Sequence, residues 1–320
     1  MKKYLAVFSA MLLFFSSALM ASAEFKDVRN THWAFDEITY LTDNKVINGY
    51  TDGTFRPQED LTRVQAMTLM AKVLKLNLSN RPNPGFKDIT PSHGSYKYVA
   101  AVMDEGLFPK KSHYLDPYKP MTRSYMANML AKGFGLKASG TYVFKDVSSK
   151  HWAYQSIKAL ASNNITLGYK DGTFRPNAAV TRAQFATFLA KAKEKQFRTF
   201  PYYSQKLVYK IQLPNYMKNK ITIKERKVKD YVYTTEFFYK DTTNKKKELF
   251  IGSIRKIHKS KMPEYKGAPF DPLKIKGDYH YFYQGPTESP YIMNGQLNSP
   301  EAKEFSKIYF KLNHMIKGIQ

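Results

Sequence analysis

The sequence contains 320 residues, 51 of them lysine or arginine, and carries a formal net charge of +25. It contains no cysteine, which excludes disulfide bonds, thiolate metal sites and cysteine redox chemistry. At this length we expect two or more domains, each stabilised by its own apolar core. The excess of positive charge favours a polyanionic partner.

Residues 1–23 are typical of a secretory signal peptide. Two lysines precede an apolar stretch from Leu5 to Met20, and Ala21-Ser22-Ala23 provides a small-residue cleavage site. We therefore expect an exported chain that begins near Glu24. No later stretch approaches the ~18 apolar residues of a membrane span, so we expect no transmembrane segment in the mature chain.

The positive charge is unevenly distributed along the mature chain. Residues 24–80 carry a net charge of −1, whereas residues 81–200 and 201–320 carry +12 each. Outside a cell, such a field attracts wall glycopolymers, lipid headgroups or stray nucleic acid. A secreted protein that is basic without a specific partner is the alternative.

One pattern occurs three times in the first two thirds of the sequence. The copies of its opening motif are separated by 61 and 58 residues, and a fixed period of this kind indicates stacked supersecondary units. The repeated segments are Phe25-Lys26-Asp27-Val28 (again at 86–89 and 144–147), His32-Trp33-Ala34 (again at 151–153), Gly49–Pro57 (again at 168–176) and Thr62-Arg63 (again at 122–123 and 181–182).

These motifs resemble the S-layer homology family over residues 25–192. Apolar residues recur at three- and four-residue spacing after Trp33 and again after Arg63, which predicts two amphipathic helices per repeat. One helix–loop–helix unit is too small to bury its own apolar face, so the three units should pack into one body. The resemblance implies the same arrangement, a three-pronged helical spindle with grooves between the prongs.

The expected fold is therefore an all-α pseudo-trimer of three repeats followed by a separate α+β domain. The expected boundaries are the signal peptide at 1–23, repeat 1 at 24–82, a degenerate repeat 2 at 83–140, repeat 3 at 141–199 and a C-terminal domain of unknown function at 200–320.

Each repeated Thr-Arg segment marks the start of a helix. In two copies a glutamine lies three residues after the threonine, as in a capping box. The arginine is then the first helical residue, beside free amides and the positive end of the helix dipole, where a carboxylate or phosphate is favoured. The capping pairs are Thr62–Gln65 and Thr181–Gln184, and the arginines are Arg63, Arg182 and, without a capping glutamine, Arg123.

Two roles remain open for these arginines. They would join the repeats through ion pairs with Asp27, Asp52 or Asp60, or they would bind an anion. The family resemblance implies the second role, with secondary cell-wall polysaccharide as the partner and its pyruvate ketals as the source of the carboxylate.

The tryptophans and two loop glycines also have two interpretations each. The tryptophans would stack on a sugar ring or, more commonly, fill the core between helices. The glycines would bring backbone close to the ligand or adopt a positive φ in a turn. The candidate polysaccharide-binding residues are Arg63, Arg123, Arg182, Gln65, Gln184, Gly49, Gly168, Trp33 and Trp152.

Repeat 2 departs from the pattern. It lacks the His-Trp pair and the Asp-Gly-Thr-Phe-Arg-Pro loop, and Tyr125 replaces the capping glutamine. We therefore expect Arg63→Ala or Arg182→Ala to weaken wall binding more than Arg123→Ala. Residues 48–59 partly match an EF-hand loop, but the equivalent window of repeat 3 does not, so we expect neither a metal nor a cofactor.

Beyond Lys195 the composition favours strands, with clusters of tyrosine and apolar residues at 207–211, 231–239 and 279–283. A hairpin tip is expected at residues 244–247, and Ser299-Pro300-Glu301 should start a final helix that covers the sheet. Glu236 and Glu248 flank the hairpin and could oppose each other as glycosidase acids do, but solvated strand charges explain them better.

The sequence thus predicts a surface-anchored binding protein that displays a basic C-terminal domain. The alternative is an anchored hydrolase with its active site in that domain, although no catalytic motif supports it. The basic domain would also contact other anionic wall polymers or a membrane surface. Nucleic acid is not expected as a partner.

Overall fold

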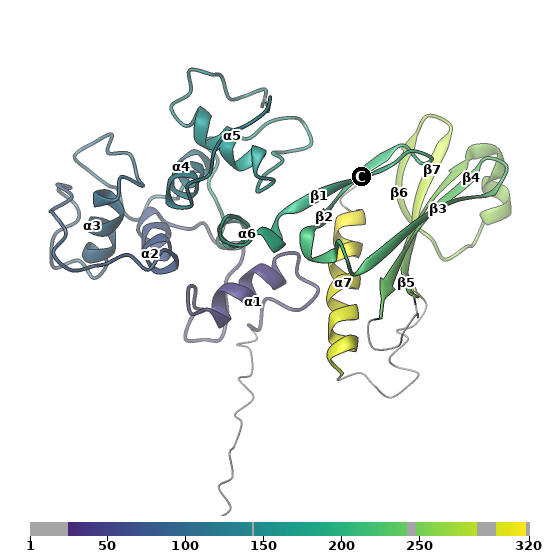
Figure 1. Ribbon diagram of the computed structural model, residues 1–320, viewed down its shortest axis with the longest axis horizontal. Coiled ribbons are helices and arrows are strands. Elements are labelled where there is room, and N and C mark those ends of the chain that lie inside the picture. The colour runs from purple at the N-terminus through teal and green to yellow at the C-terminus, as the bar shows by residue number, and fades with distance from the viewer. Residues whose placement is uncertain (1–24, 143, 242–247, 287–298, 318–320) are drawn as a thin grey trace, which may run out of the picture.

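The computed structural model describes residues 25–142, 144–241, 248–286 and 299–317 (Figure 1). The expected signal peptide and the hairpin tip at 244–247 lie outside these residues. None of the helices in the described ranges is long and apolar enough to cross a membrane.

Residues 25–193, here called the helical part, contain six α-helices. Their buried faces carry apolar residues at helical spacing, such as Ile38 and Leu41 of the first helix. The helices are α1 (Phe35–Asp43), α2 (Arg63–Val73), α3 (Tyr96–Asp104), α4 (Arg123–Gly133), α5 (Tyr154–Ser162) and α6 (Arg182–Lys193).

The helices do not pair within the repeats. Instead, the second helix of one repeat packs on the first helix of the next, as α2 with α3, α4 with α5, and α6 with α1. The expected helix–loop–helix unit is therefore not the packing unit. The segments before α2, α4 and α6 meet in isolated antiparallel β-bridges, which pair Asp60 with Thr181, Thr62 with Pro120, and Thr122 with Ala179.

Residues 195–317, here called the β-rich part, contain two antiparallel sheets. β1 pairs with β2, and the second sheet has the strand order β3-β4-β5-β7-β6. The elements are η1 (Lys195–Phe197), β1 (Thr199–Ser204), β2 (Tyr209–Pro214), η2 (Asn215–Met217), β3 (Ile221–Lys229), β4 (Val232–Lys240), β5 (Glu248–His258), η3 (Lys259–Tyr265), β6 (Asp271–Lys276), β7 (Tyr279–Gln284) and α7 (Pro300–Lys317).

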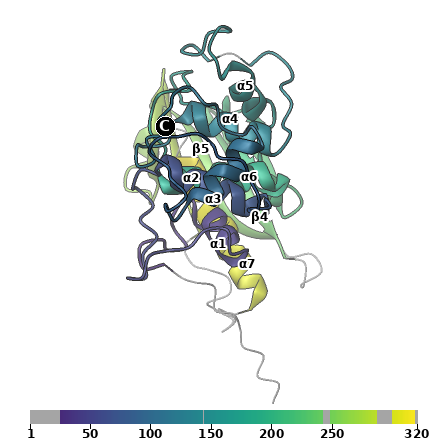
Figure 2. The same ribbon diagram turned by 90° about the vertical axis from the view of Figure 1, so that its left-hand side faces the viewer.

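The expected fold class, an all-α trimer followed by a separate α+β domain, is wrong. The chain is a mixed α+β structure with helices toward its N-terminus and a β-rich C-terminal region. The two parts are not separate: α7 lies between α1 and the five-stranded sheet in Figure 1, and α1 and α7 overlap in the view of Figure 2.

The physical reason is that one face of α7 packs on the sheets and another contacts α1. Its apolar residues, including Phe305 and Leu312, are buried in a core shared with both sheets. On another side, Lys311 donates hydrogen bonds of 2.9 Å to both carboxylate oxygens of Glu37 and one of 2.7 Å to the carbonyl oxygen of Trp33. An ion pair this deeply buried ties the helix to α1.

The two capping boxes are present as expected. Thr62 and Thr181 accept hydrogen bonds from the backbone amides of Gln65 and Gln184, whose side chains accept the threonine amides in return. Thr122 makes no such cap, and its hydroxyl lies 3.1 Å from the hydroxyl of Ser124 instead.

This difference gives a matched pair of substitutions. Thr181→Ala should lower the free energy of unfolding by about 1 kcal/mol, the usual contribution of an N-cap. Thr122→Ala should lower it by less than half as much, because no helix amide loses its acceptor. Urea unfolding of the two variants measures this difference, and equal losses would show that the cap does not stabilise α6.

Candidate functional site

A recurring aspartate organises the loop of every repeat. In repeat 1 the two carboxylate oxygens of Asp27 each accept a backbone amide at 2.7 Å, from Phe55 and from Arg56. The arrangement holds the second of these residues at a positive φ of 58°. Asp88 binds the amides of Leu115 and Asp116 in the same way, and Asp146 binds those of Phe174 and Arg175.

This role was not predicted from the sequence, although the signal was present. The Phe-Lys-Asp motif is retained even in repeat 2, which has lost most other features of the pattern. A short motif that survives in a degenerate copy indicates a structural requirement of the backbone. Here the requirement is the anchoring of the loop that faces the next arginine.

Each repeated arginine reaches the anchored loop of another repeat. Its guanidinium donates to the carbonyl oxygen of the first residue that the aspartate holds, so the arginine and the aspartate fix the same peptide segment from two sides. The contacts are Arg182 Nε to Phe55 O at 2.8 Å, Arg63 Nη1 to Leu115 O at 2.6 Å and Arg123 Nε to Phe174 O at 2.6 Å.

The expectation of free amides at the helix starts is wrong. At α4 the amide of Arg123 donates to Ala178 O at 3.0 Å and that of Ser124 to Pro176 O at 2.9 Å. Loop carbonyl oxygens likewise accept hydrogen bonds from the first two backbone amides of α2 and of α6. An anion in these grooves must therefore be bound by side chains, because the amides that would bind it at a helix N-terminus are already used.

The three guanidinium groups differ in how many of their N–H groups remain available to bind a ligand. Arg182 gives a second N–H to Asn48 O at 3.2 Å, and Arg63 lies 3.3 Å from the carboxylate of Asp116. Within the described residues, the two Nη nitrogens of Arg123 have neither a hydrogen-bond nor an ion-pair partner. Burial lowers the pKa of Arg123, yet an arginine remains a cation at neutral pH. Arg123 is 4% exposed, and its guanidinium carbon lies 4.5 to 5.3 Å from the ring centres of Phe174, Tyr169 and Phe188, so its Nη nitrogens remain for a carboxylate only on the side that these rings leave open to the cavity.

The groove beside the repeat 2 loop is filled by its own side chains. Tyr125 stacks on Phe108 with ring centroids 4.8 Å apart and contacts Trp152 at 4.9 Å. The ammonium of Lys111 lies 3.7 Å from the centre of the Trp152 ring. Trp152 is 38% exposed, so the interpretation of this tryptophan as a core residue is wrong.

The repeat 1 loop has no tryptophan beside it, although its Tyr50 lies on Arg182 as Tyr169 lies on Arg123. His32, His93 and His151 each accept a backbone amide two residues ahead through Nδ1, which aligns the three segments. The residue after the histidine is a tryptophan in repeats 1 and 3 but Gly94 in repeat 2. Because each tryptophan faces the loop of the preceding repeat, Gly94 removes the ring beside the repeat 1 loop.

The groove beside the repeat 3 loop has both a tryptophan, Trp33, and an arginine, Arg123, whose Nη nitrogens make no hydrogen bond within the described residues. A cavity of about 1000 Å³ brings together four of the sequence-predicted residues, Trp33, Arg123, Gly168 and Gln184. The β-rich part contributes the rest of its wall through β1, β2 and α7. Arg63, Arg182, Gln65, Gly49 and Trp152 do not line this cavity.

The loop glycines are explained by packing. A side chain at Gly168, where φ is 71°, would place its Cβ 2.5 Å from the carbonyl oxygen of Thr173 and 2.4 Å from the ring of Phe144. A Cβ at Gly49 would lie 2.2 Å from the ring of Phe25. Contacts this short cannot be tolerated, so glycine is required whether or not a ligand approaches.

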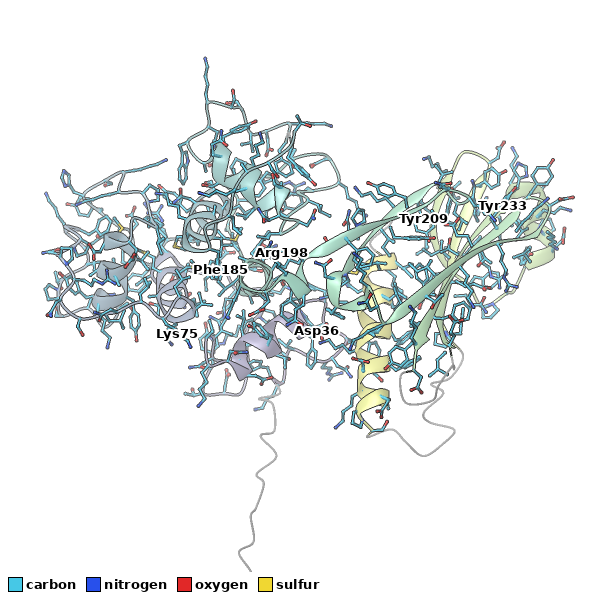
Figure 3. The ribbon with its side chains drawn as sticks, viewed as in Figure 1. Asp36, Lys75, Phe185, Arg198, Tyr209 and Tyr233 are labelled. Carbon is cyan, nitrogen blue, oxygen red and sulfur yellow. The ribbon has the colours of Figure 1, made fainter. Side chains whose placement is uncertain are left out.

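The cavity is strongly cationic. Among the described residues that line it, five side chains are cationic and one, Glu37, is acidic. Glu37 is already paired with Lys311, so it does not neutralise the others. Two residues labelled in Figure 3 lie at the junction of the two parts, Asp36 and Arg198. Asp36 accepts a hydrogen bond from the hydroxyl of Tyr216 at 2.8 Å, and Arg198 donates one to Lys191 O at 2.9 Å.

The two glutamates considered as catalytic acids do not face each other. In the β4–β5 ladder Glu236 pairs with Ser253, whereas Glu248 pairs with Lys240. Each also has its own cation, Arg226 for Glu236 and Lys224 for Glu248. Cross-strand ion pairs account for both carboxylates.

Known proteins match the helical part. The S-layer homology domain family matches residues 24–67 and 143–186, which include the first and third loops described above. An S-layer protein of Bacillus thuringiensis subsp. finitimus is 32% identical over 190 residues, which are 58% of this chain and 23% of that protein. An S-layer protein of Bacillus licheniformis is 35% identical over 186 residues, 56% of this chain and 21% of that protein.

An uncharacterised cell wall amidase of Bacillus anthracis is 33% identical over 199 residues, which are 61% of this chain and 36% of that protein. The chain thus spans less than a quarter of the length of the two S-layer proteins and about a third of the amidase. The repeated motifs, the loops held between an aspartate and an arginine, and these matches all point to the same family of domains. The chain carries S-layer homology domains at residues 24–67 and 143–186 and is a secreted protein of the cell surface, bound to the cell wall.

Proposed function

We propose that the chain is anchored by an anionic, pyruvylated secondary cell-wall polysaccharide that enters the cavity beside the repeat 3 loop. The observation that carries this proposal is the convergence of Arg123, Trp33 and Gln184 on one cationic cavity. The β-rich part has a net charge of +12 over residues 201–320 and lines the same cavity. The anchor therefore holds the β-rich part at the cell surface.

The chemistry of the cavity suits an acidic sugar. The two free Nη nitrogens of Arg123 match the two oxygens of a carboxylate, such as that of a pyruvate ketal. Trp33 and Tyr169 add aromatic faces for the apolar side of a sugar ring. Gln184 uses its side-chain oxygen for the helix cap, which leaves its amide nitrogen to donate to a hydroxyl.

The proposal changes the order of importance of the arginines. Arg63 and Arg182 are occupied by a carboxylate or by a second carbonyl, and their grooves are filled or lack a tryptophan. Arg123 therefore replaces them as the principal ligand-binding residue, in spite of its place in the degenerate repeat.

Arg123→Lys tests this order, because lysine keeps the charge but loses the fork. We expect about tenfold weaker retention on purified cell wall, whereas Arg63→Lys and Arg182→Lys should change it by less than about threefold. Co-sedimentation with wall material measures the retention, and circular dichroism confirms that all three variants are folded.

Treatment of the wall with mild acid to remove pyruvate ketals provides the ligand control. Wild-type retention should then fall to the level of Arg123→Lys. Unchanged retention would contradict the pyruvylated ligand, and a larger loss in Arg182→Lys than in Arg123→Lys would contradict the choice of groove.

A further inference from the structure

Lys191 differs from the lysines at the same position in the other repeats. Each lysine follows its helix-start arginine by nine residues, Lys72 in α2, Lys132 in α4 and Lys191 in α6. Lys72 and Lys132 are exposed, and the ammonium of Lys132 donates to Gly106 O at 2.8 Å. Lys191 is half-buried and lines the cavity.

The β-rich part causes this difference. It covers the last turns of α6, where Arg198 caps the helix by donating to the carbonyl oxygens of Lys191 and Ala192. Desolvation there lowers the pKa of Lys191 to about 8. Within the described residues its ammonium has no hydrogen-bond or ion-pair partner.

The charged neighbours of Lys191 do not neutralise it. Glu37 of α1 is the one carboxylate that acts on it, and that group is bound by Lys311 of α7. His314 of α7 lines the same cavity, and burial lowers its pKa, so it adds no charge at neutral pH. The half-buried ammonium therefore has no counter-ion among the described residues, and an anion in the cavity would supply one.

The β1–β2 hairpin adds three polar groups to the same wall. Tyr203 and Lys210 are opposite each other in the ladder, and the Lys210 ammonium lies 5.1 Å from the centre of the tyrosine ring. The side chain of Gln212 also lines the cavity and makes no hydrogen bond within the described residues. A cation, an aromatic face and an amide together suit an anionic saccharide.

We propose that Lys191, together with Lys210 and Tyr203 of the β-rich part, forms a second anion-binding subsite for a saccharide that carries one negative charge at Arg123 and another at Lys191. The charge is a carboxylate or a phosphate on a sugar. This inference rests on the proposed function, and it makes the β-rich part a component of the anchor in addition to the module that the anchor holds.

The test compares probes with one and two anionic groups on the full chain, by isothermal titration calorimetry near pH 7. Digalacturonic acid carries two carboxylates, galacturonic acid one, and glucose 1,6-bisphosphate carries two phosphates. Wild type should bind one of the two probes with two anionic groups about tenfold more tightly than the probe with one group of the same kind, galacturonic acid or glucose 1-phosphate. The probe that gains this advantage identifies the carboxylate or the phosphate as the source of charge.

Lys191→Met should abolish this advantage and leave galacturonic acid binding within about twofold of wild type. Lys72→Met, the matched control on α2, should change neither. Lys210 is exposed, so we expect Lys210→Met to fold as wild type does and to remove part of the advantage. The wild-type advantage should also disappear at about pH 10, where Lys191 has lost its proton, whereas Lys191→Met should show no such change.

The outcomes separate this subsite from the anchor itself. If Lys191→Met binds the probes with two anionic groups as wild type does, or if wild type binds none of the probes while it is retained on cell wall, the subsite is wrong and the anchor stands. If wild type is not retained on cell wall, the proposed function fails, whichever probes bind.

Discussion

Lys311→Met should lower the free energy of unfolding by about 3 kcal/mol or more, the usual cost of removing one partner of a buried ion pair. Glu37 is 2% exposed and Lys311 9% exposed, so water cannot solvate the carboxylate that the substitution leaves behind. The carbonyl oxygen of Trp33 loses its donor as well. Because this contact joins α7 to α1, the substitution should loosen the wall of the cavity.

Chemical denaturation of Lys311→Met, Glu37→Gln and the double variant measures the coupling. The double variant should be more stable than either single one, because it leaves no buried charge unpaired. Lys307→Met is the control: Lys307 is 44% exposed and lies 3.6 Å from Asp36, so its loss should cost less than about 1 kcal/mol. Equal losses at positions 307 and 311 would contradict a buried pair at the junction.

Asp146→Asn should weaken both the fold and the anchor. Asparagine has one acceptor oxygen in place of two, and its amide group would face the N–H of Phe174 or Arg175. The carboxylate is partly in water, so we expect a loss of about 2 kcal/mol in the free energy of unfolding. The released loop also carries the carbonyl oxygen that positions Arg123, so retention on cell wall should fall about tenfold.

Asp171→Asn provides the control within the same loop. Asp171 is exposed, and hydrogen bonds from Thr173 and Arg175 lower its pKa to about 2, but it binds the amide of Thr173 and not those of Phe174 and Arg175 that Asp146 holds. Its replacement should leave wall retention close to that of wild type. A loss of retention as large as that of Asp146→Asn would show that the loop responds to any change of charge.

Features that depend on neighbouring residues were predicted well from the sequence. The capping boxes at Thr62 and Thr181, the arginine as first residue of each helix and the start of α7 at Pro300 were all found where they were expected. Each depends on side chains within about one helical turn, so spacing along the chain is enough to specify it.

Features that depend on distant residues were not predicted. The amides at the helix starts are satisfied by loops of other repeats, and Arg182 binds a carbonyl oxygen 127 residues away, at Phe55. The order that we propose for the arginines differs from the predicted one for the same reason: Arg123 belongs to the degenerate repeat, but it lines one cavity with Gly168 and with Trp33 of repeat 1.

The sequence by itself determined that this protein carries three copies of a helical motif with arginines at the helix starts, because local spacing and capping chemistry are written along the chain. Only the tertiary structure decided that the β-rich part packs beside the repeat 3 loop and lines one cavity together with Arg123 and Lys191. The equivalent lysines at 72, 132 and 191 show why: the same residue is exposed or desolvated according to what packs over it, and that packing brings together residues far apart in the sequence.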